Sequence, residues 1–236
     1  MATKSVYLPQ PAVTNSIIQI TDEEHRHLAV ARAELGEQTD VFDGRGHVWV
    51  CEVVDVAKRH TSLKVIREWD SPAPRVELIL ALALIHRPAF ELALEKAVET
   101  GVTRIIPLVA SRSNIARADR SGRSDRWQRI VVEAAKQSKR FHLPRLDAPV
   151  PFAQTLQVEA GSKIMFAEHN GSPLKSAVAG SPVLYLVGPE GGWTDDELSS
   201  ARDAGFHMVS LGSGILRSET VAIVGAALIR YELGDM

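Results

Sequence analysis

The pattern of apolar and polar positions divides the chain into two parts. Up to about residue 70, short apolar runs alternate with glycine-containing turns, and few segments have helical spacing. From residue 75 onward, continuous apolar runs alternate with segments whose apolar residues recur at helical spacing. Prolines at positions 72 and 74 exclude a helix between the two parts and stiffen an extended connection. We therefore predict two domains, residues 1–71 and 75–236.

The first domain is predicted to be a small β-barrel. Residues 16–20 and 62–66 have the composition of short strands, and Thr21 can cap a helix that follows the first of them. Residues 41–50 contain two strand-like runs around Asp43-Gly44, and an Asp-Gly pair supplies the positive φ of a tight hairpin. Short strands joined by glycine turns, with few helices, are typical of small barrels.

The second domain is predicted to be a mainly parallel sheet flanked by helices. Its strand candidates are residues 76–84, 104–109, 163–168, 183–187 and 208–210. One helix carries Pro88 in its first turn and ends near Gly101, a second covers residues 124–140, and residues 144–161 form a loop-rich crossing. Regular alternation of strand and helix favours an α/β fold.

Two glycine-rich loops follow the last two predicted strands. Residues 188–192 read Gly-Pro-Glu-Gly-Gly, and residues 211–220 read Leu-Gly-Ser-Gly-Ile-Leu-Arg-Ser-Glu-Thr. Ligands of open α/β sheets bind outside the carboxyl ends of the strands, where both loops lie. Neither loop has the pattern of a phosphate-binding P-loop or of a dinucleotide-binding fingerprint. The first loop by itself fits a tight turn as well as a binding site.

Helix starts follow both loops. Thr194 and Glu197 form a capping-box pattern, and a helix N-terminus beside a glycine turn exposes backbone N–H groups to a ligand. Arg217 precedes the last helix, where a cation opposes the helix macrodipole. This unfavourable position suggests a functional role for Arg217, although a salt bridge to Glu190 or Glu219 would also explain it.

The charge is unevenly distributed. The net charge is −2, but residues 104–145 contain eleven Lys or Arg and three Asp or Glu, which gives this segment +8 and the remainder −10. A local basic segment in an acidic chain favours contact with a polyanion over a merely solvated helix face. The single cysteine, Cys51, excludes an internal disulfide, and we find neither a signal peptide nor a membrane-spanning run. These features fit a cytoplasmic protein.

The combined motifs resemble the RsmE-type 16S rRNA uracil-N3 methyltransferases of the SPOUT superfamily. The resemblance rests on residues 188–192, on Leu211-Gly212 with 215–220 and Ala222, on 95–102, on Arg126-Trp127 with 133–138, and on 42–44. Order and spacing match over nearly the whole chain. The chain departs from the usual family pattern at residues 86–88 and 31–33, positions that concern RNA contacts more than the cofactor site.

The resemblance implies a SPOUT-type α/β domain with a deep trefoil knot, preceded by a PUA-like β-barrel that binds RNA. It implies S-adenosylmethionine (SAM) as cofactor, 16S rRNA or the small ribosomal subunit as partner, and a homodimer. The expected cofactor-binding residues are Ala167, Leu186, Gly188, Glu190, Gly191, Leu211, Gly212, Ile215 and Leu216.

Arg217 is the candidate for stabilising the uracil anion, and Glu190 for orienting Arg217 or accepting the N3 proton. The expected RNA contacts are Arg112, Arg117, Arg126, Lys136, Lys139 and Arg140. His86 and His169 are candidate neighbours of the pocket, although lone histidines are more often structural or exposed.

Two alternatives remain at this stage. A non-catalytic, ribosome-associated RNA-binding protein would share the basic segment but would not need two glycine loops above strand ends, and its lack of affinity for SAM would identify it. A SPOUT methyltransferase that acts on another RNA or another atom would be identified by its product nucleoside.

Overall fold

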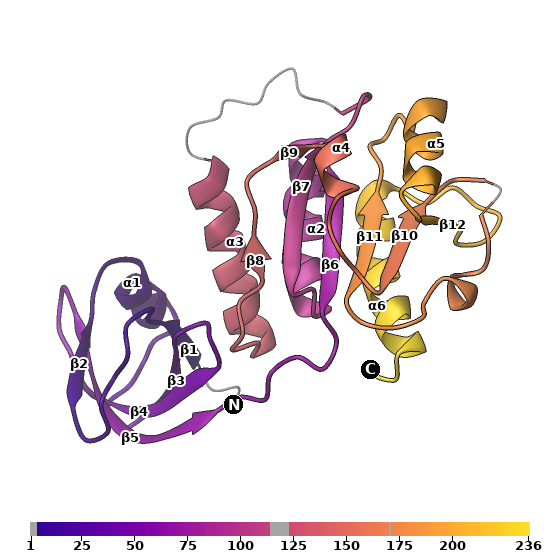
Figure 1. The fold of residues 1–236 in the computed structure, drawn as a ribbon. Coiled ribbons are helices and arrows are strands. Elements are labelled where there is room, and N and C mark those ends of the chain that lie inside the picture. The colour runs from indigo at the N-terminus through magenta and orange to yellow at the C-terminus, as the bar shows by residue number, and fades with distance from the viewer. Residues whose placement is uncertain (1–3, 114–122, 170) are drawn as a thin grey trace. The chain divides into compact units, whose positions relative to one another are not determined.

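A computed structural model describes residues 4–113, 123–169 and 171–236 (Figure 1). Its internal contacts divide the chain into two compact units. The first unit combines residues 1–73 with 135–143, and the second combines 74–134 with 144–236. Residues 135–143 therefore join the first unit although they lie inside the second along the chain.

The first unit is a five-stranded sheet with one helix. Its elements are β1 (Lys4–Tyr7), β2 (Ile17–Ile20), α1 (Asp22–Val30), β3 (Gln38–Phe42), β4 (His47–Val56) and β5 (Thr61–Asp70). The strand order is β1-β3-β4-β5-β2; β1 pairs with β3 in parallel and the other pairs are antiparallel. The β3–β4 hairpin confirms the prediction for residues 41–50, and Gly44 and Gly46 have φ of 78° and 105° in its turn.

The core of the first unit forms on the long strands β4 and β5. Trp49, Cys51 and Val53 of β4 pack with Leu63 and Val65 of β5. Burial raises the pKa of the Cys51 thiol to about 12, so it stays protonated at neutral pH. Cys51 therefore serves as a small apolar core residue.

The second unit is a parallel sheet between helices. Its strands are β6 (Leu78–Ala83), β7 (Arg104–Val109), β8 (Arg145–Leu146), β9 (Val150–Pro151), β10 (Ser162–Phe166), β11 (Val183–Val187) and β12 (His207–Val209). Its helices are α2 (Arg87–Glu99), α3 (Arg123–Ser138), α4 (Phe152–Thr155), η1 (Leu174–Ser176), α5 (Asp195–Asp203) and α6 (Ser218–Glu232). The order β12-β10-β11-β6-β7-β8, with β9 also on β7, is parallel throughout, as predicted.

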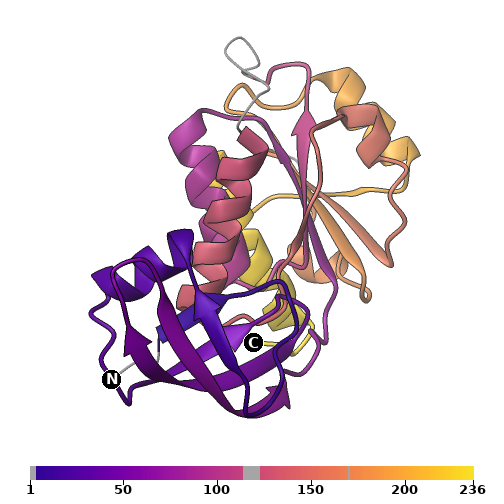
Figure 2. The same ribbon diagram turned by 90° about the vertical axis from the view of Figure 1, so that its left-hand side faces the viewer.

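The central strands are buried on both faces, because successive side chains of a strand point to opposite sides. In β6, Leu78, Leu80 and Leu82 join the core beneath α2 and α6, while the alternate residues join the core beneath α4 and α5. Figure 2 shows these helices on the two faces of the sheet. Because every side chain of such a strand is buried, β6 reads as a continuous apolar run in the sequence.

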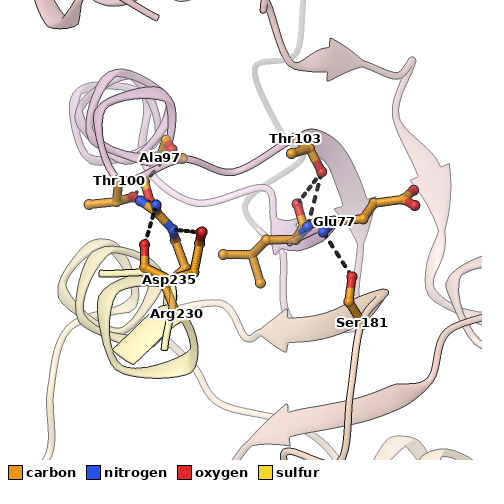
Figure 3. Close-up of polar contacts among 8 residues, drawn as sticks. Glu77, Ala97, Thr100, Thr103, Ser181, Arg230 and Asp235 are labelled. Carbon is orange, nitrogen blue, oxygen red and sulfur yellow. Dashed lines mark hydrogen bonds and ion pairs between the residues drawn. The ribbon is translucent and has the colours of Figure 1, made fainter. Parts of the chain in front are cut away.

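Polar side chains tie the elements together at the edge where the strands begin (Figure 3). Thr103 bonds the backbone N–H and C=O of Leu78, and Ser181 accepts the N–H of Glu77. Arg230 of α6 donates to the carbonyl of Thr100, at the end of α2, over 3.0 Å. These contacts hold the starts of the strands and the ends of α2 and α6 together.

Several predicted boundaries shift. Strand β10 ends at Phe166 rather than at residue 168, which releases residues 167–169 into a loop. The helix predicted for residues 124–140 is α3, and the crossing at 144–161 contains β8, β9 and α4.

None of the described helices is long and apolar enough to cross a membrane. The knot stays a prediction.

Candidate functional site

A cavity of about 700 Å³ lies at the carboxyl edge of the parallel sheet. The segments that follow β6, β7, β10, β11 and β12 all contribute to its walls. Parallel strands release their connecting loops at one edge, so loops distant in sequence converge there. This is the position that the two glycine loops predicted.

The structure brings most of the predicted cofactor residues together. The residues from the prediction that line the cavity are Ala167, Gly188, Glu190, Gly191, Leu211, Ile215 and Leu216, and Arg217 lines it as well. Leu186 and Gly212 are not among the lining residues, and Leu186 is fully buried within β11. His86 and His169, named as candidate neighbours, also line the cavity.

The loop at residues 188–192 is closely packed at its first glycine. A Cβ on Gly188 would lie 2.9 Å from the indole ring of Trp193, so only glycine fits there without a shift. The indole N–H of Trp193 donates to the carbonyl of Phe166 over 2.9 Å, which joins this loop to the end of β10. Trp193 therefore forms a wall between the two segments, a role that the sequence motifs on either side of it did not indicate.

Arg112 fastens the same loop from the side of β7. Its Nη1 donates to the carbonyl oxygens of Gly191, at 2.8 Å, and Trp193, at 3.3 Å. A Cβ on Gly191 would meet the aliphatic stem of Arg112 at 3.3 Å. A side chain predicted to contact RNA thus also shapes the cavity wall.

Glu190 is held at the start of α2. Its Oε1 accepts the backbone N–H of His86, the N-cap residue of α2, over 2.8 Å. A carboxylate at this end of a helix is favoured by the macrodipole and by the unpaired N–H groups. The carboxylate of Glu190 therefore positions its loop against α2, and no salt bridge to Arg217 is present in the described contacts.

The capping box at α5 is confirmed and extends to another loop. Thr194 accepts from the backbone N–H of Glu197, and the Glu197 carboxylate accepts from Thr194 in return. The second oxygen of Glu197 accepts the N–H of Ser111 over 2.8 Å. The buried Glu197 thereby links the start of α5 to the segment after β7.

The second glycine loop leads into α6. Ser218 is the first residue of this helix, and its hydroxyl donates to the carbonyl of Gly188 over 2.7 Å, which joins the two loops. Arg217 occupies the N-cap position; its side chain is 87% exposed and lies 4.0 Å from Glu219. Such a weak contact leaves the guanidinium able to reach a bound molecule.

The predicted RNA contacts have different surroundings. Arg117 lies outside the described residues, Arg112 and Arg126 are exposed, and Arg140 is half-buried. The side chain of Lys136 is 3% exposed and pairs with Glu24 at 3.0 Å, while Lys139 pairs with Asp40 at 3.0 Å. The ammonium of Lys136 is enclosed by a structural ion pair, so it lacks the exposure that a phosphate contact requires.

The arrangement suits an organic ligand. The cavity has apolar walls from Phe166, Val187, Leu211 and Ile215, interrupted by backbone groups of the glycine loops. Pockets for small molecules usually combine apolar walls with a few polar groups in this way. Among the described residues, no group of three or more His, Cys, Asp or Glu side chains could hold a metal ion.

Comparisons with known proteins agree with this architecture. A family model for the RNA methyltransferase domain matches residues 71–230, and one for the RNA methyltransferase PUA domain matches residues 20–66. A Synechocystis protein named ribosomal RNA small subunit methyltransferase E is 34% identical, over 97% of this chain and 77% of that protein. A protein of the same name from Rickettsia conorii is 29% identical, over 98% and 96%.

The solved structures that are similar to this chain include a protein of the same name. The crystal structure of a ribosomal RNA small subunit methyltransferase E from Neisseria gonorrhoeae, bound to SAM, has a TM-score of 0.91 and 28% identity, covering 98% of each chain. A second structure with bound SAM, from Legionella pneumophila, also has a TM-score of 0.91, at 25% identity and 98% coverage of each chain.

Proposed function

We propose a function from one premise: the chain belongs to the ribosomal RNA small subunit methyltransferase E family. In this proposal, the protein transfers a methyl group from SAM to N3 of a uridine in 16S ribosomal RNA. The observation that carries this proposal is the cavity at the carboxyl edge of the sheet, whose walls both glycine loops share.

The residues present fit SAM. The apolar walls and exposed backbone groups match a purine and its polar substituents, and Glu168 adds a carboxylate beside the first loop. Ala167, Gly188, Gly191, Leu211, Ile215 and Leu216 hold the cofactor. SAM supplies an electrophilic methyl group, and S-adenosylhomocysteine (SAH) is the product that remains after the transfer. Leu186 supports the loop from within β11, and Gly212 provides the positive φ of 83° in the second loop.

The side chains at the cavity mouth act on the uracil. N3 must lose its proton before it becomes a good nucleophile, and the resulting negative charge spreads to O2 and O4. The exposed guanidinium of Arg217 stabilises this charge. Glu190, held by the N–H of His86, helps to accept the proton.

The remaining parts of the proposal concern assembly and surroundings. The first unit, as a PUA-like domain, binds RNA together with Arg112, Arg126, Lys139 and Arg140. The second unit carries the trefoil knot and forms a homodimer, for which α6 offers the exposed Leu228 and Tyr231. The substrate is 16S rRNA or the small subunit, so the enzyme acts in the cytoplasm.

Titration calorimetry with SAH tests the cofactor site. We expect the wild type to bind and a Gly191→Trp variant not to bind, because a large side chain at residue 191 would collide with Arg112 and fill the cavity. Equal affinity in both proteins would show that the cofactor binds elsewhere.

A methyl-transfer assay on small subunits that lack the modification tests the catalytic residue, with analysis of the product nucleoside. Arg217→Ala should lower kcat by about 10²-fold or more, as loss of a group that stabilises a developing anion does in other enzymes. Near-normal turnover at saturating RNA and SAM would exclude this role for Arg217, and a product other than N3-methyluridine would revise the reaction.

A further inference from the structure

A cluster of three charged side chains lies at the start of α2, beside the cavity but outside its lining. The carboxylate of Glu91 accepts from Nε of Arg87 at 2.8 Å, and from both Nε and Nη2 of Arg126, the latter at 2.7 Å. The Glu91 side chain is 16% exposed, whereas Arg87 and Arg126 are 61% and 49% exposed. One shielded anion therefore holds two exposed cations, and the cluster carries a net positive charge.

The cluster has a rigid base. Phe90 precedes Glu91 on α2 and Trp127 follows Arg126 on α3, and their rings pack with centroids 4.7 Å apart. Both rings are buried in the core beneath α2 and α6. The backbones that carry Glu91 and Arg126 are thus fixed directly beneath the charged groups.

The cluster also adjoins the cavity. His86 and Ala89 line the cavity, and the backbone N–H of His86 donates to Glu190 of the first glycine loop. Arg87 is the next residue after His86. The first turn of α2 therefore connects the cavity wall on one side with the two arginines on the other.

We propose that Arg87 and Arg126 bind a backbone phosphate of the RNA next to the nucleotide that enters the cavity, with Glu91 as the positioning residue. This inference rests on the proposed function. A guanidinium has five N–H donors; the described contacts with Glu91 use one donor of Arg87 and two of Arg126. Because one carboxylate holds both arginines, their remaining donors lie close together, and guanidinium donors suit the oxygens of a phosphate.

Glu91 contributes by holding the arginines in place before RNA arrives. Long charged side chains lose conformational freedom on binding, and prior ordering reduces that loss. The competing explanation is that the cluster only joins α2 to α3. A cluster with that role alone would affect the Tm, and its loss would leave the dependence of RNA binding on salt at the wild-type slope.

The main experiment measures binding of an in vitro 16S rRNA transcript by filter assay between about 50 and 200 mM salt. Arg87→Gln and Arg126→Gln should each weaken binding, and the double variant should reduce the slope of log affinity against log salt by about 0.7, the value for the one single-strand phosphate that both arginines contact. Arg202→Gln is the matched control, because Arg202 is an exposed arginine on α5 and its replacement removes the same charge. That variant should retain the wild-type slope.

The Glu91→Gln variant tests whether Glu91 positions the two arginines. Removal of a negative charge strengthens RNA binding if only long-range attraction matters. Positioning predicts the opposite: weaker RNA binding and a raised KM for RNA, with the KM for SAM unchanged. Stronger binding by this variant would overturn the role of Glu91.

Two further measurements distinguish failure of this inference from failure of the proposed function and from loss of structure. SAH affinity should equal that of the wild type in every variant; a wild type that fails to bind SAH would instead count against the proposed function. Thermal unfolding identifies loss of structure. If the double variant lowers the Tm but keeps the wild-type salt slope, the cluster is a structural tie and the proposal is wrong.

Discussion

Single residues of this protein join loops that lie far apart in the chain. Arg112, after β7, holds the carbonyls of Gly191 and Trp193, about eighty positions later. Ser218 holds the carbonyl of Gly188, and Glu190 holds the N–H of His86. The first glycine loop is therefore supported from three directions, and its conformation depends on side chains outside the motif.

Arg112→Ala should weaken SAH binding about tenfold. Hydrogen bonds from a charged donor contribute about 1.5–3 kcal/mol, and the exposure of Arg112 places the effect at the lower end of that range. Calorimetry measures the loss of SAH affinity. In the methyl-transfer assay, the same change should appear as a raised KM for SAM with a smaller change in kcat. Arg202→Ala is the control for the lost charge, and wild-type affinity in Arg112→Ala would show that the loop holds its shape alone.

At the scale of elements, helices α2 and α6 share one face of the sheet and approach it closely. In α6, a Cβ on Gly225 would lie 2.7 Å from Cε2 of Phe166 in β10. The hydroxyl of Tyr185 in β11 donates to the carbonyl of Ala222, and burial raises the Tyr185 pKa. Small residues in α6 thus permit the close contact that places Arg217 at the cavity.

Gly225→Ala should destabilise the protein by about 1 kcal/mol. Alanine favours a helix by about 1 kcal/mol over glycine, but overpacking a tight contact usually costs about 1–3 kcal/mol. Urea unfolding measures the difference. Gly180→Ala is the control, since its Cβ would meet nothing within 4 Å. A stabilised Gly225→Ala variant would mean that Phe166 moves aside easily.

The contact between α2 and α3 should depend on pH. Hydrogen bonds from Arg126 and Arg87 lower the pKa of Glu91 from 4.5 to about 2. Because the folded-state pKa is the lower one, this contribution is fully present above the unfolded value and is lost as the pH falls toward 2. The Tm difference between the wild type and Glu91→Gln should therefore shrink from about pH 5 to about pH 3. A constant difference would show that Glu91 does not titrate with folding.

At the scale of the whole molecule, the chain combines two units whose boundaries do not follow the sequence. Residues 135–143 lie in the first unit, where Lys136 and Lys139 pair with Glu24 and Asp40. Part of the basic segment therefore stabilises the first unit, and its high charge overstates the surface available to RNA.

The proposed homodimer can be tested at the same scale. Tyr231 on α6 is 69% exposed, as is Leu35 in the first unit. Tyr231→Glu should shift the sedimentation equilibrium from dimer toward monomer, because it buries a charge in an apolar contact. Leu35→Glu should leave the wild-type mass unchanged. A wild type that sediments as a monomer would remove the dimer from the proposal.

The sequence by itself determined the elements whose signals are local. The Asp-Gly hairpin, the capping box at Thr194 and Glu197, and the apolar runs of the buried strands depend on neighbouring residues and on burial. The two glycine loops after strand ends indicated the edge of the sheet where the cavity lies, because parallel strands release their loops together.

Only the tertiary structure decided which side chains support those loops. The contact of Glu190 with His86 spans 104 positions and that of Arg112 with Gly191 spans 79. Burial turned Lys136 from a candidate RNA contact into part of an ion pair. Such pairings depend on how helices and strands pack, and no local pattern of residues encodes them. The sequence therefore indicated where the cavity lies, and the packing determined which side chains support its walls.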